Sequence, residues 1–230
     1  MTEPRTVGRM LLETHVRWQR LLELIDESTT EPKRDSIQPG NEKGSMQRTL
    51  IARNNESFSF IYQENIDAMA NVAFFDPETE LPMLDDVKLL YLPGGYPEKH
   101  LDVLVKAEAT RHAISEYAKR GGRIIAECGG MMYLCEKIVT DEGEFPMCGV
   151  LPYSITARKN DRKLSLGYRQ FSLDGKEYRG HEFHYTQFLG QAPPSVTQVY
   201  NAKGEPVPTP VIRYRNVLAS YTHLYQLIDL

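Results

Sequence analysis

One cysteine near the middle of the chain has the setting of a catalytic nucleophile. An apolar, β-prone run at residues 123–126 leads to Cys128, and a helix-compatible stretch starts near Met131. Gly129 and Gly130 stand between them. This is the strand–turn–helix pattern of a nucleophile elbow, where small neighbours let the backbone turn sharply and the substrate approach. A thiol just before a helix is also favoured as the thiolate. A lone cysteine is more often a small buried hydrophobic side chain, but this setting predicts a reactive thiol.

The other two cysteines have no such setting. Cys135 lies seven residues after Cys128 and is expected two turns further along the same helix, facing the core. Cys148 does not lie in a strand–turn–helix pattern. Both are predicted to be buried free thiols. Three cysteines without paired spacing indicate a reducing compartment.

A cysteine that attacks an amide needs a base, usually histidine, to carry protons to and from the reacting groups. His223 follows an apolar strand-like run, and this is the end of a sheet strand where ligands bind in α/β folds. On position, His223 comes first, followed by His181 or His184. In the run that holds these two, alternation places Glu182 and His184 on one strand face. The remaining histidines are surface, packing or site-entrance residues: His15, His112 and His100.

Glycine pairs follow two of the predicted strands. Gly94 and Gly95 end the run at residues 87–92, and Gly129 follows Cys128. If these strands are neighbours, the three backbone amides converge beside the thiol. They would then form the oxyanion hole that acyl transfer requires.

The elements expected to position these groups alternate between strand and helix. Four runs are predicted to be strands: 48–52, 71–75, 87–92 and 123–127. Two stretches are predicted to be helices: 59–70 and 98–120. A further helix is expected from the elbow to about Lys137. This order predicts an α/β fold with a mainly parallel sheet and helices on both faces. Beyond it, residues rich in Val, Tyr, Phe and Thr predict further strands with few helices.

The first 47 residues differ in character from the rest of the chain. Residues 1–26 contain an amphipathic helical segment, and residues 27–47 are polar with two prolines and two glycines, as in a flexible linker. The compact domain is therefore predicted to occupy residues 48–230.

Composition excludes several classes of function. The 230 residues carry a net charge of −4, with no basic stripe suited to nucleic acid. No long apolar window predicts a membrane span or a signal peptide, so we expect a cytoplasmic protein without a membrane partner. The spacing in residues 181–184 does not suit a zinc helix, so no metal site is expected. No P-loop motif is present, and hence no ATP site is expected in this chain.

Six motifs in order carry a resemblance to a known family. They are YLPGGYPE (91–98), AECGGMMYL (126–134), GVLP (149–152), LGYR (166–169), GHEFHYT (180–186) and ASYTHLY (219–225). Together they cover most of residues 48–225. With them the chain resembles the C-terminal glutamine amidotransferase domain of the cobyrinate a,c-diamide synthases. The N-terminal helical segment resembles the last helix of the preceding domain in that family.

The resemblance implies a class I glutamine amidotransferase fold, a flavodoxin-like three-layer sandwich. It implies that Cys128 attacks the side-chain amide of glutamine to form a thioester and release ammonia, with His223 as the general base. In the family, ammonia passes to an ATP-dependent synthetase domain, which uses ATP and Mg and amidates the a and c side chains of the corrinoid. That domain, or a separate subunit in its place, is therefore the expected partner.

One departure from the wider superfamily concerns the partner of the histidine. Many glutamine amidotransferases carry a glutamate two residues after the catalytic histidine, where this chain has Tyr225. Glu182, with His184 beside it, is one candidate for a supporting role. The alternative is a Cys–His dyad, since the third member of such a site mainly orients the histidine.

Two other functions remain open from the sequence. The chain could serve a split ligase with a different ammonia acceptor, such as a cell-wall lipid precursor. It could instead be an interaction module whose elbow survives without turnover. Release of ammonia from glutamine separates the second alternative from the enzyme.

Overall fold

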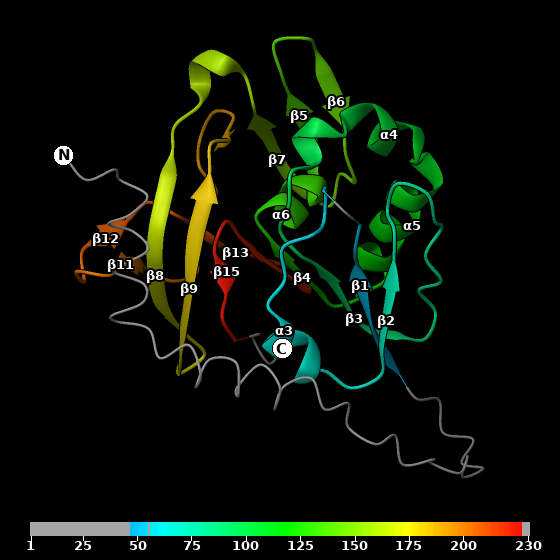
Figure 1. Cartoon of the computed structure of the whole chain (residues 1–230), viewed down its shortest axis with the longest axis horizontal. Coiled ribbons are helices and arrows are strands. Elements are labelled where there is room, and N and C mark those ends of the chain that lie inside the picture. The colour runs from blue at the N-terminus through cyan, green and yellow to red at the C-terminus, as the bar shows by residue number, and fades with distance from the viewer. Residues whose placement is uncertain (1–46, 55, 227–230) are drawn as a thin grey trace, which may run out of the picture. The chain divides into compact units, whose positions relative to one another are not determined.

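The computed structural model describes residues 47–54 and 56–226 (Figure 1). They lie within residues 45–230, the larger of the two units into which the chain divides. The predicted helical segment at 1–26 and nearly all of the predicted linker at 27–47 lie outside the described residues.

The centre of the fold is a six-stranded sheet. Its order is β13-β14-β4-β3-β1-β2, and all neighbouring pairs are parallel except β13 and β14. The strands are β1 (Arg48–Ala52), β2 (Val72–Phe75), β3 (Val87–Leu92), β4 (Ile124–Glu127), β13 (Val211–Tyr214) and β14 (Val217–Ser220). The chain crosses over between β3 and β4 and again before β14. The carboxyl ends of β3, β4 and β14 therefore meet at one edge of the sheet.

Both faces of this sheet are buried, which is why its strands are apolar almost throughout. On one face Leu90, Ile124 and their neighbours pack against three helices: α4 (Leu101–Lys106), α5 (Glu108–Lys119) and α6 (Gly129–Leu134). On the other face Ile51, Tyr91 and Ile125 pack near the short α3 (Gln63–Asp67). The α/β fold with a mainly parallel sheet is thus confirmed.

A second sheet covers the rest of the α3 face. Its order is β12-β11-β8-β9-β15, and it packs on β13 and β14 through Phe171, Val211 and Leu218. Its strands are β8 (Ser165–Leu173), β9 (Lys176–His184), β11 (Val199–Asn201), β12 (Pro206–Val207) and β15 (His223–Leu224). In Figure 1, β15 (red) runs beside β9 (yellow). One outer layer is therefore shared between a short helix and a sheet.

A third, smaller sheet has the order β10-β7-β5-β6. It consists of β5 (Cys135–Val139), β6 (Glu144–Pro146), β7 (Leu151–Thr156) and β10 (Gln187–Phe188). Two single 3-10 turns, η1 (Pro97–Lys99) and η2 (Lys159–Asp161), complete the described elements.

The predicted strands agree closely with the structure, and the predicted helices less so. The stretch at 98–120 divides into η1, α4 and α5, and the stretch at 59–70 is helical only over Gln63–Asp67. The prediction that the elbow helix runs to about Lys137 is wrong, because α6 ends at Leu134 and β5 begins at Cys135. The β-branched Ile138 and Val139 favour a strand here, and β6 and β7 supply pairing partners on both sides.

Candidate active site

Cys128 occupies the sharp turn between β4 and α6. Its backbone angles are φ 44° and ψ −107°, a region that residues other than glycine rarely adopt. The Cys128 amide donates to the Ser220 carbonyl at 2.8 Å, and the Cys128 carbonyl accepts from the Met132 amide at 3.0 Å. The end of β14 and the first turn of α6 thus hold the strained residue in place.

The two glycines after Cys128 are required by close packing. A Cβ on Gly129 would lie 2.6 Å from the Gly95 carbonyl oxygen and 2.7 Å from Cδ of Pro97. A Cβ on Gly130 would overlap the Leu92 carbonyl group. Since the backbones after β3 and β4 touch, the elbow pattern in the sequence reflects a real steric requirement.

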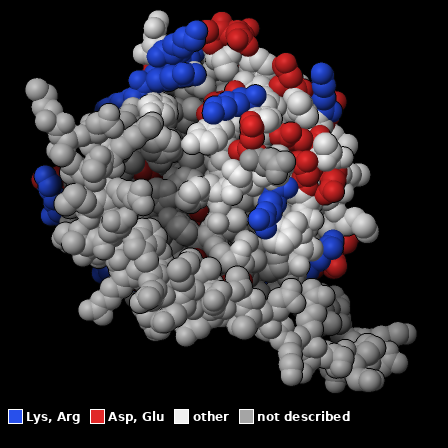
Figure 2. All heavy atoms as spheres, viewed as in Figure 1, with Lys and Arg blue, Asp and Glu red and all other residues white. Residues whose placement is uncertain are grey.

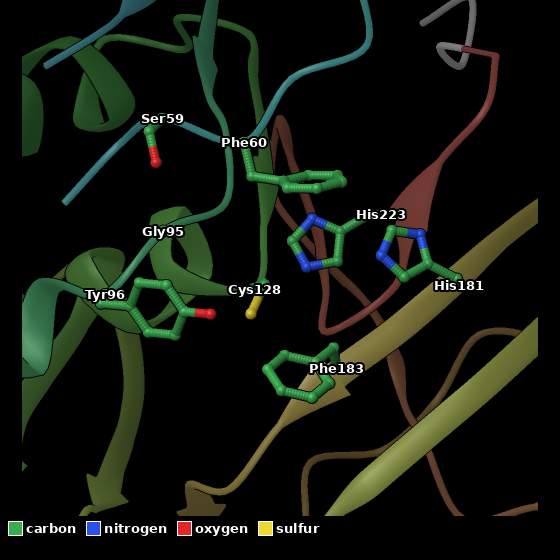
Figure 3. A pocket seen from close by; sticks show the side chains of 8 residues that line it. All are labelled: Ser59, Phe60, Gly95, Tyr96, Cys128, His181, Phe183 and His223. Atoms are coloured by element: carbon green, nitrogen blue, oxygen red, sulfur yellow. The ribbon is translucent and has the colours of Figure 1, made fainter. Parts of the chain in front are cut away.

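Cys128 and His223 open into one cavity of about 180 Å³. Figure 3 shows the Cys128 sulfur and the His223 ring pointing into it from the elbow and from β15. The other lining residues come from three segments of the chain: Ser59, Phe60, Gly95, Tyr96, His181 and Phe183. The candidate nucleophile and the candidate base therefore face the same small, largely aromatic space.

The His223 imidazole is buried and held by rings. Phe60 meets it edge-on at 4.6 Å between centroids, and His181 stacks on it at 4.9 Å. Burial lowers the pKa of His223 to about 3, and the neighbouring His181 and His184 contribute to the shift. Its Nδ1 has no hydrogen-bond partner within the described part of the chain. At neutral pH, His223 is thus an uncharged base.

The thiol is in its neutral form as well. Burial raises the pKa of the Cys128 thiol, the nearby Glu98 raises it further, and the Gly129 amide offsets this only in part. The expectation that the start of the helix would hold a thiolate is therefore wrong for the resting site. The helix α6 has only six residues, so its dipole is weak beside the cost of burying a charge.

Gly94 and Gly95 have different roles. The Gly94 amide donates to the Phe60 carbonyl at 3.2 Å, so it is not available to an oxyanion as the sequence had suggested. A Cβ on Gly94 would instead overlap the His223 ring. Gly95 lines the cavity, and no hydrogen bond among the described residues uses its amide. Of the three predicted donors, Gly95 and Gly129 remain.

Glu182 and His184 lie on the opposite face of β9 from His181. Glu182 forms a buried ion pair with Arg169 at 2.9 Å and accepts hydrogen bonds from Ser165 at 2.7 Å and Thr222 at 3.4 Å. Burial opposes its charge, but the hydrogen bonds from His184 and Ser165 and the charge of Arg169 outweigh it and lower its pKa to about 2.

The structure does not bring Glu182 to the ring of His223. It contacts Thr222, the residue before the histidine. His184 stacks on Tyr221 at 3.7 Å between centroids and makes a hydrogen bond with the Thr186 carbonyl at 2.9 Å. Both side chains thus contact the segment that carries His223.

Of the remaining histidines, His100 and His112 do not line the cavity, and His15 lies outside the described residues. Four of the lining residues were not predicted from the sequence. His100 contacts Glu56 at 2.6 Å, whereas His112 is exposed on α5. Cys135 and Cys148 are buried free thiols, as expected. Phe183 could have been found from its alternation with His181, and Tyr96 from its place after Gly95. Nothing in the sequence marks Ser59 or Phe60.

The surface around the fold carries both charges. Figure 2 shows acidic and basic side chains interspersed on the described part of one face. Within residues 47–54 and 56–226, no group of His, Cys, Asp and Glu side chains is placed to hold a metal ion. None of the helices in those ranges is long and apolar enough to span a membrane.

The chain is similar in sequence to several curated proteins. It is 31% identical over 235 residues to the cobyrinate a,c-diamide synthase of Archaeoglobus fulgidus, covering 95% of this chain and 50% of that one. It is 39% identical over 193 residues to the hydrogenobyrinate a,c-diamide synthase of Rhizobium meliloti, covering 77% and 43% respectively. The chain therefore spans about half the length of the curated relatives it matches.

Solved structures and a family model agree on the fold. A glutamine amidotransferase from Thermotoga maritima superposes with a TM-score of 0.51 at 20% identity, over 77% of this chain and 76% of that one. PurLQS from the same organism gives a TM-score of 0.52 at 16% identity, over 77% and 87%. The model of the CobB/CobQ-like glutamine amidotransferase domain matches residues 50–228. The chain therefore belongs to the CobB/CobQ-like glutamine amidotransferase domain family.

Proposed function

We propose that this domain hydrolyses glutamine with Cys128 as nucleophile and His223 as general base. The observation that carries the proposal is the shared cavity of about 180 Å³, into which the strained elbow and the buried, neutral imidazole both open. A strained nucleophile and an uncharged base in one small space suit acyl transfer from an amide.

The reaction would proceed in two stages. The sulfur of Cys128 attacks the side-chain amide carbon of glutamine while His223 accepts the thiol proton. The same proton then passes to the departing nitrogen, so that ammonia leaves and a γ-glutamyl thioester remains. Water, deprotonated by His223, hydrolyses the thioester to glutamate and returns the thiol.

The negative oxygen of each tetrahedral intermediate needs donors. The amides of Gly95 and Gly129 lie on the two glycine turns that touch beside the cavity. Backbone donors of this kind are already oriented when charge develops, and so they favour the transition state. The Cys–His pair would thus work as a dyad, with Glu182 and His184 supporting the segment around His223.

The ammonia would serve an ATP-dependent synthetase half, in the same polypeptide or in a separate subunit. This follows from the relatives, whose names are cobyrinate and hydrogenobyrinate a,c-diamide synthase and of which the chain matches about half. The acceptor would be the a and c carboxylates of a corrinoid, and ATP and Mg would bind in the synthetase half. In this scheme residues 48–230 form the amidotransferase domain of a cytoplasmic enzyme.

The test measures ammonia and glutamate released from glutamine by the purified chain, with and without a synthetase half from a relative such as the Archaeoglobus fulgidus enzyme. We expect turnover that is abolished by Cys128→Ser, and a covalent adduct of 6-diazo-5-oxo-norleucine on Cys128. An adduct on Cys135 or Cys148, or full turnover in Cys128→Ser, would refute the assignment.

A further inference from the structure

Within the described part of the chain, no hydrogen bond orients the His223 ring through Nδ1. Its Nδ1 is buried without a partner among the described residues, and Glu182, the carboxylate considered from the sequence, accepts a hydrogen bond from Thr222 instead. Yet a general base must keep its ring aimed at the thiol, because a displacement of about 1 Å can cost about 100-fold in rate. The orientation must therefore come from the backbone and from packing.

A second buried carboxyl group contacts the backbone next to this histidine. Glu127 is the last residue of β4, directly before Cys128, and it is almost fully buried. Its Oε1 accepts a hydrogen bond from the Leu224 amide at 3.3 Å. That amide belongs to the peptide bond between His223 and Leu224. One side chain thus links the strand of the nucleophile to the strand of the base.

The same short segment is held from two other sides. The buried side chain of Asn65 on α3 donates to the Leu224 carbonyl at 2.9 Å. On the β9 side, His223 pairs with His181, and a Cβ on Gly180 would overlap the His223 carbonyl. The peptide that carries the imidazole is consequently fixed on each side, and Glu127 is the member that reaches back to the nucleophile.

The Glu127 carboxyl group has few hydrogen-bond partners among the described residues. It lies on the same face of β4 as Ile125 and beside Tyr91 of β3, and no salt bridge to it is found among residues 47–54 and 56–226. Burial raises its pKa to about 8, although Tyr91 and the Leu224 amide act in the opposite direction. A carboxyl group is costly to bury without a salt bridge. Its one backbone contact, to the His223 segment, therefore suggests a purpose at the site.

We propose that Glu127 is a positioning residue that holds the His223 segment in register with Cys128, in place of a carboxylate on the imidazole itself. The proposal rests on the proposed glutaminase function of the same site. It concerns geometry alone, because Glu127 is not among the residues that line the cavity.

The test compares three substitutions in the full chain. Glu127→Met keeps the volume but removes the acceptor, so we expect kcat to fall about 10- to 100-fold with KM within about twofold. Glu127→Gln keeps a carbonyl acceptor and should restore most of kcat. Glu136→Gln, the same change at an exposed position of β5, is the matched control and should leave both constants unchanged.

A second readout does not depend on turnover. The ¹⁵N signals of the His223 ring should move in Glu127→Met and stay near their wild-type positions in Glu127→Gln. Equal kcat losses in the Met and Gln variants, or wild-type kcat with unmoved ring signals in the Met variant, would overturn the proposal. If Glu127→Met does not fold, Glu127→Asp, which withdraws the acceptor by one methylene, takes its place with the same expectations. A wild-type chain without turnover would instead contradict the proposed function, and the ring signals would still decide the role of Glu127.

Discussion

The His223 ring occupies the space that a side chain on Gly94 would need. A Cβ at Gly94 would overlap Cε1 of the imidazole and lie 2.6 Å from its Nδ1. The glycine is therefore needed for the base to reach the cavity, and its own amide is already bonded to Phe60. This contact explains a conspicuous glycine pair without assigning both members to an oxyanion hole.

Gly94→Ala should displace the imidazole and reduce kcat for glutamine about 100-fold. The fold should survive, because the three atoms nearest to the added methyl group all belong to the His223 side chain at the cavity wall. Ammonia release and thermal melting measure the two effects separately. Gly143→Ala is the control for a glycine replacement away from the site: its Cβ would meet nothing within 4 Å, although its φ of 154° is unfavourable for alanine. It should lower the melting temperature but keep wild-type kcat. Unchanged turnover in Gly94→Ala would show that the ring tolerates displacement.

The strain at Cys128 predicts an order of stability among inactive variants. Cys128→Gly and Cys128→Ala both remove the thiol, but only glycine relaxes at φ 44°. We expect the Gly variant to be more stable than the Ala variant by about 1 kcal/mol. Urea unfolding of the two proteins measures the difference. Equal stabilities would mean that the positive φ does not persist in solution.

Because His223 is neutral, its protonation should not reduce activity near the usual histidine pKa of about 6.5. Because burial lowers the pKa of His223 to about 3, the base stays unprotonated well below pH 6.5. Plots of kcat/KM for glutamine against pH should therefore show no loss attributable to this histidine between pH 7 and about pH 5. A limb near pH 6.5 that disappears on replacing His181 would assign the titration to the stacked neighbour instead.

The same burial makes the fold sensitive to acid. Between pH 6.5 and about pH 3 the unfolded chain binds a proton at residue 223 and the folded chain does not. The free energy of unfolding should thus fall as the pH decreases through this range. His223→Gln should flatten this dependence in urea titrations at pH 7 and pH 4.5. The exposed His112→Gln serves as the control and should leave the slope unchanged.

The buried pair of Arg169 and Glu182 should behave as a unit. Arg169→Met leaves the Glu182 carboxylate buried with hydrogen bonds but no cation, and should cost about 3 kcal/mol of unfolding free energy. The double change Arg169→Met with Glu182→Met should recover part of this loss. A double-mutant cycle in urea measures the coupling, and additive losses would contradict it.

Among these features, the local ones could be predicted from the sequence. The apolar runs at 48–52 and 87–92 are strands with the predicted bounds, because a buried parallel strand needs an almost continuous apolar run. The elbow at Cys128 could also be predicted, since only small residues allow the sharp turn. The sequence by itself therefore determined the fold class and the family, and it marked Cys128 as the candidate nucleophile.

Tertiary structure decided how the site is assembled. Chain segments far apart in sequence bring His223 beside His181 through β9, place Phe60 against the imidazole, and turn Glu182 toward Arg169. The helix expected through Cys135 became β5, because pairing with β6 and β7 outweighed the local pattern. The charge states of Cys128 and His223 also depend on burial, which is a property of the packed molecule. Contacts between distant segments carry no periodic signal, so these features emerged only with the fold.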